Sequence, residues 1–366
     1  MDEVPVIDVM AYMTKEKGKW QQECEKVAHS LHKFGIIVFK DPRFSEAENQ
    51  QYLDMMERYF SDRGERYYKG EILKDSKPEI FYQTGVTPEL KEKAKDHEKL
   101  LEKMSPENKP MSPFPPEYDA KWRFFWNIGE RPAERQNVYP KVVPEDFPEW
   151  EERMNTWGGR LQDGGMLAAE MAAIGMGLEP DTFTKMMTQG PHLLAPTGSD
   201  LKKWDVGTPF AGFHYDLNFL TCHGKSRYPG LFVWLRDYRK VQVKVPAGCF
   251  LMQAGIMFEH LTGGYVLAGY HEVIYTEATK VALKKAEDEA ALKGKEMIAW
   301  RVSSTLFTHL RYDVDLEPLE GLEGKINVAE ARQKYKKITA DEKLHEELAA
   351  IALMDDARKA NAADGH

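Results

Sequence analysis

Hydrophobic and polar positions repeat with a helical period in the first part of the chain. Residues 4–9 form a short apolar run that predicts a strand, and apolar residues then recur every three or four positions over 20–34, which predicts a helix. Gly35 is placed to end that helix, and 36–41 reads as a second strand. A further helix is expected over 45–59, with serine as its N-cap.

The middle of the chain changes character twice. Residues 61–121 carry dense charge, with five prolines between 106 and 116, which is typical of surface helix and irregular connection. We interpret this stretch as a solvated insertion, with a lid as the alternative. A long helix is then predicted over 149–176, ended by Gly177.

From about residue 190 to 315 apolar residues recur at every second position, and glycines divide this pattern into short strands. Such spacing predicts a sandwich or a jelly-roll barrel. An alanine-, lysine- and glutamate-rich stretch over 277–297 predicts an inserted helix, and 328–358 is also expected to be helical. The expected fold class is α+β with a mainly β core: a double-stranded β-helix, or jelly-roll, barrel with flanking helices and an N-terminal helical region.

The 366 residues allow two domains or one large β-barrel domain with helical flanks. We divide the chain into an N-terminal helical and strand region over 1–180, a jelly-roll core over 181–325, and C-terminal helices with a tail over 326–366.

Composition narrows the class of protein. Apolar residues make up 42% and aromatic residues 11% of the chain, enough for a packed core. A net charge of −9 argues against a broad nucleic-acid-binding surface. The chain opens on Met1-Asp2-Glu3 rather than on a basic leader, and its three cysteines are too few and too scattered for a disulfide framework. We therefore expect a cytoplasmic, monomeric protein with reduced thiols and no nucleic-acid or membrane partner.

The triplet His214-Tyr215-Asp216 is the first sign of chemistry. Side chains two positions apart on a strand point to the same face, so the imidazole and the carboxylate can converge on one point. One such pair suits a borderline divalent ion such as Fe(II). The pattern is weak alone, because His345-Glu346-Glu347 also fits it in an expected surface helix.

A third ligand would make the pattern more specific. His271 lies in an alternating strand after the Gly263-Gly264 turn, and His260 lies just before that turn. Two histidines and one carboxylate form a facial triad that leaves coordination positions open. We favour His271 over His260 as the third ligand.

Arg301 and Ser303 again share one strand face. A guanidinium with a neighbouring hydroxyl can hold a carboxylate at the far end of a ligand that chelates the metal.

This ordered set resembles the isopenicillin N synthase-like branch of the Fe(II)/2-oxoglutarate-dependent oxygenases. The set is the H-x-D triplet at 214–216, an apolar strand with Gly263-Gly264, a distal His271, and R-x-S at 301–303. The opening strand, helix and strand are similar to that family as well, so the resemblance spans most of residues 4–320 and is specific over 212–303.

The resemblance implies that His214, Asp216 and His271 ligate Fe(II), while Arg301 and Ser303 bind 2-oxoglutarate. The implied reaction uses O₂, releases succinate and CO₂, and oxidises an unactivated C–H bond of a small molecule by hydroxylation, desaturation or oxidative cyclisation. A kainoid-type ring closure in specialised metabolism is one specific option.

Three departures place the chain in a divergent subgroup. Glu272 stands where the family often has arginine, and residues 193–196 lack its usual tyrosines. About twenty extra residues, the 277–297 helix, separate the distal histidine from the R-x-S motif.

Other readings stay open. One is a 2-oxoglutarate-independent iron oxidase of the isopenicillin N synthase type, and another is a non-catalytic jelly-roll binding protein. The resemblance places a substrate strand near residue 125, and basic residues soon after the triplet would suit an acidic substrate. The candidate substrate residues are Arg123, Phe125, Trp126, Asn127, Lys225 and Arg227.

Overall fold

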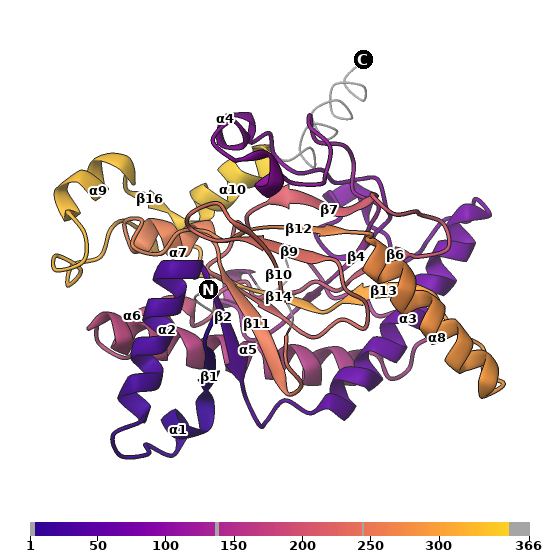
Figure 1. Ribbon diagram of the computed structural model, residues 1–366, viewed down its shortest axis with the longest axis horizontal. Coiled ribbons are helices and arrows are strands. Elements are labelled where there is room, and N and C mark those ends of the chain that lie inside the picture. Colours follow the sequence, from indigo (N-terminus) through magenta and orange to yellow (C-terminus); the bar gives the residue numbers. More distant parts are fainter. Residues whose placement is uncertain (1–3, 136–138, 244, 351–366) are drawn as a thin grey trace.

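The computed structural model describes residues 4–135, 139–243 and 245–350. Strands fill the centre, and helices lie around them (Figure 1). The strands are β1 (Val6–Asp8), β2 (Ile36–Lys40), β3 (Gly85–Thr87), β4 (Trp122–Asn127), β5 (Leu193–Leu194), β6 (Thr197–Asp200), β7 (Pro209–His214), β8 (Leu220–His223), β9 (Leu231–Trp234), β10 (Lys240–Gln242), β11 (Cys249–Ala254), β12 (Tyr270–Ile274), β13 (Trp300–Ser303), β14 (Thr305–Thr308), β15 (Asp315–Leu316) and β16 (Ile338–Thr339).

The helices predicted over 20–34 and 149–176 agree with the structure within one residue, and the one predicted over 277–297 ends five residues early. The described helices are α1 (Val9–Met13), α2 (Trp20–Phe34), α3 (Glu46–Tyr68), α4 (Glu98–Leu101), α5 (Trp150–Met176), α6 (Thr182–Met187), α7 (Ile256–Leu261), α8 (Glu277–Leu292), α9 (Val328–Lys334) and α10 (Ala340–Ala350). Single 3₁₀ turns lie at Pro78–Ile80, Pro106–Asn108 and Ala133–Arg135.

Two sheets make up the β core. The larger has ten strands in the order β1-β2-β11-β8-β14-β5-β4-β6-β13, with β3 paired to β4 at its side. The smaller has the order β10-β9-β12-β7, and β15 pairs with β16 separately. The two sheets face each other across a cavity, but no strand pairs join them into a closed barrel within the described ranges. The expected barrel is thus two open, opposed sheets.

Strands from the N-terminal third are part of the large sheet. β2 pairs antiparallel with β11, with Ile37 opposite Met252, and β1 adds to β2 in parallel. β4 pairs with β5 and β6, which places the 122–127 strand next to the middle of the chain. The division into three regions stays an interpretation. The first two regions share the large sheet, and the third is joined to the second by the pairing of β16 with β15.

The long helix α5 covers the outer face of the large sheet, and glycines allow its close approach. A Cβ at Gly164 would lie 2.6 Å from Cζ of Phe250, and one at Gly165 would lie 2.9 Å from Cγ2 of Thr308. Both distances are shorter than real Cβ contacts, so larger residues would push the helix away from β11 and β14.

Most predicted helices are present. The Ser45 side chain accepts a hydrogen bond from the Glu48 amide and caps α3, which continues nine residues beyond the expected end at 59, to Tyr68. The inserted helix is α8, and the predicted helix over 328–358 is divided into α9 and α10 by residues 335–339 within the described part.

The stretch 61–121 is tied to the sheets rather than detached from them. β3, within it, pairs with β4. Glu272 on β12 is completely buried, and its carboxylate accepts hydrogen bonds from the Met111 and Ser112 amides at 2.9 and 3.0 Å. The residue that departs from the family pattern therefore anchors this segment to the strand that carries His271.

Two further findings concern the whole described chain. All three cysteines are buried and unpaired. Among the described helices, none is both long enough and apolar enough to cross a membrane.

Candidate metal centre

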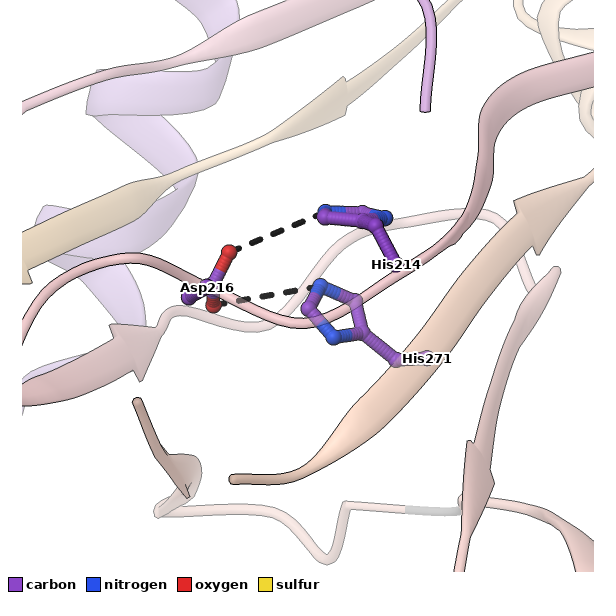
Figure 2. A group of neighbouring side chains, drawn as sticks. All are labelled: His214, Asp216 and His271. Carbon is purple, nitrogen blue, oxygen red and sulfur yellow. Dashed lines mark ion pairs between the residues drawn. The ribbon is translucent and has the colours of Figure 1, made fainter. Parts of the chain in front are cut away.

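Three side chains converge at one end of the small sheet (Figure 2). His214 is the last residue of β7, Asp216 follows two positions later, and His271 lies directly opposite His214 on the antiparallel strand β12. The His214 Nε2 atom is 3.7 Å from Asp216 Oδ1, and the His271 Nε2 atom is 3.9 Å from Asp216 Oδ2. The sequence thus brings together one carboxylate and two imidazoles, a set that Fe(II) and similar ions bind.

Hydrogen bonds orient each of the three groups. The Nδ1 atom of His214 lies 2.6 Å from the Gly212 carbonyl oxygen, and that of His271 lies 3.3 Å from the Gly269 carbonyl oxygen. A carbonyl can only accept, so these contacts put the proton on Nδ1 and leave the Nε2 lone pair for a metal. The Thr221 hydroxyl donates to Asp216 Oδ2 at 2.6 Å and fixes the carboxylate.

Burial and mutual charge favour the protonation states that a metal ligand needs. Burial, together with the neighbouring His271, lowers the pKa of His214 to about 3. Burial alone would raise the pKa of Asp216, but His271 and His214 outweigh it and lower that pKa. The centre therefore consists of a neutral imidazole at His214 and an ionised carboxylate at neutral pH.

The alternative ligand, His260, lies elsewhere. It is on α7, where its Nε2 atom is 2.9 Å from the Lys336 carbonyl oxygen and its ring packs against Tyr335. The geometry therefore agrees with the preference for His271, while the role of these residues as ligands stays a prediction.

We expect the His271→Ala variant to lose Fe(II) binding, because one of three ligand atoms is removed. His260→Ala should keep the affinity of the unmodified chain, since that side chain is not at the centre. Anaerobic titration with Fe(II), followed by calorimetry, would measure both. Loss of iron in His260→Ala with retention in His271→Ala would show that the assignment is wrong.

The centre opens into a cavity of about 530 Å³ between the two sheets. Both sheets line it: His214, Leu231, His271 and Val273 come from the small sheet, and Arg123, Phe125, Leu193, Thr197, His223, Leu251, Arg301, Ser303, Thr305 and Phe307 come from the large one.

Arg301 and Ser303 both line the cavity, as their shared strand face predicts. Arg301 is 5% exposed, and no carboxylate in the described ranges pairs with it. Its Nε atom donates to the Pro229 carbonyl oxygen at 3.1 Å, and burial lowers its pKa to about 10. A buried guanidinium without a counter-ion is costly, so the cavity is suited to an anionic ligand at this point.

Sequence reasoning missed His223. It lies on β8 opposite Thr305 of β14, and its ring centroid is 5.8 Å from that of His271. Its Nε2 atom is buried without a hydrogen-bond partner in the described structure. Burial, together with the charges of His271 and Arg301, lowers the pKa of His223 to about 4. The next residue along the chain, Gly224, donates its amide hydrogen to the Ser304 carbonyl oxygen at 2.7 Å, so His223 lies near the end of the strand that carries Arg301. The only signal in the sequence is that His223 lies two positions after Thr221 on one strand, so that both side chains point to the same face.

The candidate substrate residues divide into three groups. Phe125, Asn127 and Lys225 line the cavity. Arg123 and Arg227 line it as well but carry acidic partners, Glu92 for the first and Asp54 and Glu57 for the second.

Trp126 does not line the cavity, and its prediction as a substrate residue is wrong. It is fully buried, and its Nε1 atom donates to Asn155 of α5 at 2.9 Å. Alternation along β4 explains this, because Phe125 and Asn127 point into the cavity and Trp126 points to the helix side.

Helix α10 contributes Leu344 and Leu348 to the cavity wall. Glu347, between them, forms an ion pair with Lys95 and accepts a hydrogen bond from the Tyr215 hydroxyl at 3.2 Å. Tyr215 separates His214 from Asp216 in the sequence, so the C-terminal helix is joined to the loop that carries the metal centre.

No protein-family model matches the sequence, and no curated protein matches it significantly. Solved structures do share its fold. A provisionally assigned 2OG-Fe(II) oxygenase family protein from Caulobacter crescentus superposes with a TM-score of 0.69 at 19% identity, over 95% of this chain and 99% of that one. A full-length protein from Neurospora crassa, in complex with alpha-KG, superposes with a TM-score of 0.68 at 17% identity, over 95% of this chain and 96% of that one. JOX2, in complex with 2OG, Fe and JA, superposes with a TM-score of 0.61 at 15% identity, over 93% of this chain and 83% of that one. At these identities the likeness establishes the fold.

Proposed function

We propose that this protein is a non-haem Fe(II)- and 2-oxoglutarate-dependent oxygenase that oxidises an unactivated C–H bond of a small molecule. One observation carries the proposal: His214, Asp216 and His271 converge in a cavity that also holds the buried Arg301, which has no carboxylate partner among the described residues. Structures of the same fold in complex with alpha-KG, or with 2OG and Fe, support it.

The residues present fit both groups. Two Nε2 atoms and one carboxylate are the donor set of a facial triad, which leaves positions open for a chelating ligand and O₂. Arg301 and Ser303 would hold the distal carboxylate of 2-oxoglutarate through a charged pair and a hydroxyl. When bound, iron and 2-oxoglutarate would supply the oxidising chemistry, with O₂ consumed and succinate and CO₂ released.

The chain itself binds, orients and excludes water. The Gly212 and Gly269 carbonyls and the Thr221 hydroxyl hold the three ligands in place. His223 lines the same cavity, with its ring centroid 5.8 Å from that of His271, and its Nε2 atom, which has no partner in the described structure, can form a hydrogen bond with the chelating ligand. Leu344 and Leu348 place apolar surface over the cavity, which limits entry of water.

The finer assignments stay proposals. Membership in the isopenicillin N synthase-like branch is supported by the R-x-S spacing and by the opening elements. Hydroxylation, desaturation and oxidative cyclisation, including a kainoid-type closure, all use such a centre, and the metal ligands do not choose between them. A cytoplasmic, monomeric enzyme that acts on a small molecule is the setting we propose.

A 2-oxoglutarate-independent iron oxidase is the second candidate, because R-x-S also occurs in that subgroup. The two candidates differ in product. Incubation of the Fe(II)-loaded chain with 2-oxoglutarate and O₂ should release succinate, slowly without substrate and faster with one. Iron-dependent O₂ consumption without succinate would favour the oxidase. Absence of Fe(II) binding would favour a non-catalytic binding protein.

A further inference from the structure

Arg131 is a further cation in the cavity lining that has no counter-ion in the described structure. Its Nη2 atom donates to Asn127 Oδ1 at 2.5 Å, and its Nε atom is buried without a hydrogen-bond partner. Asn127 is in turn held by the Tyr139 carbonyl oxygen, which accepts from its Nδ2 atom at 3.0 Å. The neighbours of this guanidinium thus orient it without neutralising it.

A second unpartnered group lies beside Arg131. His309 is 5% exposed and lines the cavity, and its Nδ1 atom has no hydrogen-bond partner in the described structure. Burial, His192 and the charge of Arg131 lower the pKa of His309 to about 3, whereas Asp216 acts in the opposite direction.

Strand pairing places His309 on the same wall as Arg131, because Asn127 of β4 and Phe307 of β14 both lie opposite Leu193. The residue before Leu193 links the two strand ends: the His192 carbonyl oxygen accepts from the Ile128 amide at 3.1 Å, and the His192 Nδ1 atom accepts from the His309 amide at 3.0 Å.

Strand register separates this pair from the proposed 2-oxoglutarate site. Thr305, at the start of β14, follows Arg301 of β13 by four residues and lies opposite His223. His309 follows four residues later, beyond the end of β14, and at about 3.3 Å per residue that is roughly 13 Å along the strand. The two arginines therefore belong to different parts of one cavity.

We propose that Arg131 binds a carboxylate of the organic substrate, with His309 beside it and the reacting carbon directed toward the metal centre. A carboxylate is favoured over a phosphate because a single positive charge is present at this site, whereas a phosphate monoester carries nearly two negative charges at neutral pH. Apolar side chains, Leu193 and Phe307, line the cavity between the two sites and suit a hydrocarbon body. The inference rests on the proposed oxygenase function and adds the substrate class to it.

A binding experiment tests this without turnover. The full chain is saturated with Mn(II) and 2-oxoglutarate under anaerobic conditions, which fills the Arg301 site. Aliphatic and aromatic monocarboxylic acids, each paired with its primary amide, are then titrated by calorimetry. We expect at least one acid to bind more tightly than its amide. Arg131→Met should lower the affinity for that acid by roughly ten- to a hundredfold, because a charge-assisted pair is lost. The affinity for the amide should stay unchanged. Arg131→Lys should recover part of the affinity for the acid.

Arg135→Met is the control, because it removes the same charge four residues away, at a partly exposed position outside the cavity lining, where Arg135 pairs with Asp341 at 3.7 Å. It should leave acid binding unchanged. Binding of acids and amides with equal affinity across the panel would overturn the proposal, as would acid binding that is insensitive to Arg131→Met. A loss of 2-oxoglutarate affinity in Arg131→Met, without a loss in Arg301→Ala, would show that 2-oxoglutarate binds at Arg131 instead. That result would also overturn the proposal.

Stability provides a second readout. Because Arg131 has no counter-ion in the described structure, Arg131→Met should lower the melting temperature of the ligand-free chain by no more than the loss of its single hydrogen bond to Asn127 produces, as measured in Asn127→Ala. The substitution should abolish the increase that the bound acid produces. A decrease larger than that of Asn127→Ala without ligand would indicate a structural role and overturn the proposal. Failure of Fe(II) to bind, with acid binding at Arg131 retained, would instead reject the oxygenase function alone.

Discussion

Replacement of Asp216 by alanine is expected to reduce iron-dependent turnover by more than about a hundredfold. Asp216 is the only carboxylate of the triad and contacts both histidines, so its removal leaves two neutral ligands that hold a divalent ion poorly. Loss of an outer hydrogen-bond partner alone costs about 10- to 100-fold at metal sites, and loss of a ligand should exceed that. Succinate release and Fe(II) affinity would be measured on the same preparation.

The fold should survive this change, because the centre lies at the cavity and not in the packed core. The circular dichroism spectrum and the melting temperature of the metal-free variant should match those of the metal-free unmodified chain. His345→Ala is the matched control: its H-x-E sequence also fits the triplet pattern, but the side chain is exposed on α10. Full activity in Asp216→Ala would contradict the metal assignment.

The second large effect is expected at Arg301. If 2-oxoglutarate is the co-substrate, its distal carboxylate forms a buried ion pair with this guanidinium. Removal of one partner of such a pair costs about 3–5 kcal/mol, so Arg301→Ala should raise the apparent KM for 2-oxoglutarate by on the order of a hundredfold or more. Fe(II) affinity should change little, because Arg301 is not among the metal-binding group.

Graded variants separate charge from geometry at that site. Arg301→Lys should recover part of the 2-oxoglutarate affinity, since lysine keeps the charge but not the two-pronged donor. Ser303→Ala should cost less, about 0.5–2 kcal/mol, for one lost hydrogen bond. Arg239→Ala, at an exposed position, serves as the control. An unchanged KM in Arg301→Ala would favour the iron oxidase instead.

The grouping of the metal centre could be predicted because it depends on short-range rules. His214 and Asp216 are two positions apart at the end of a strand, and the alternation around His271 fixes the face of β12 that carries it. Phe125 and Trp126 show the limit of this reasoning. A segment can be assigned to the site from sequence, but which of two adjacent residues faces the cavity depends on the strand's register within the sheet.

The second arginine site could not be predicted from sequence. Arg131 follows the end of β4, and His309 follows the end of β14, 178 positions later in the chain. Each is an isolated polar residue outside any periodic pattern. Only the pairing of β4 with β5 and of β5 with β14 brings them to one wall. The open form of the two sheets likewise depends on long-range pairing that short strands do not encode.

The anchoring of Met111 and Ser112 by Glu272 limits how this protein can be shortened or recombined. Deletion of the proline-rich stretch around 105–117 would remove both donors from a completely buried carboxylate. A carboxyl group left without hydrogen-bond partners in that buried position is strongly destabilising, and it is adjacent to His271 in the same strand. A viable deletion would therefore have to replace Glu272 with an uncharged residue at the same time, so this loop and this strand can be exchanged between related proteins only as a pair.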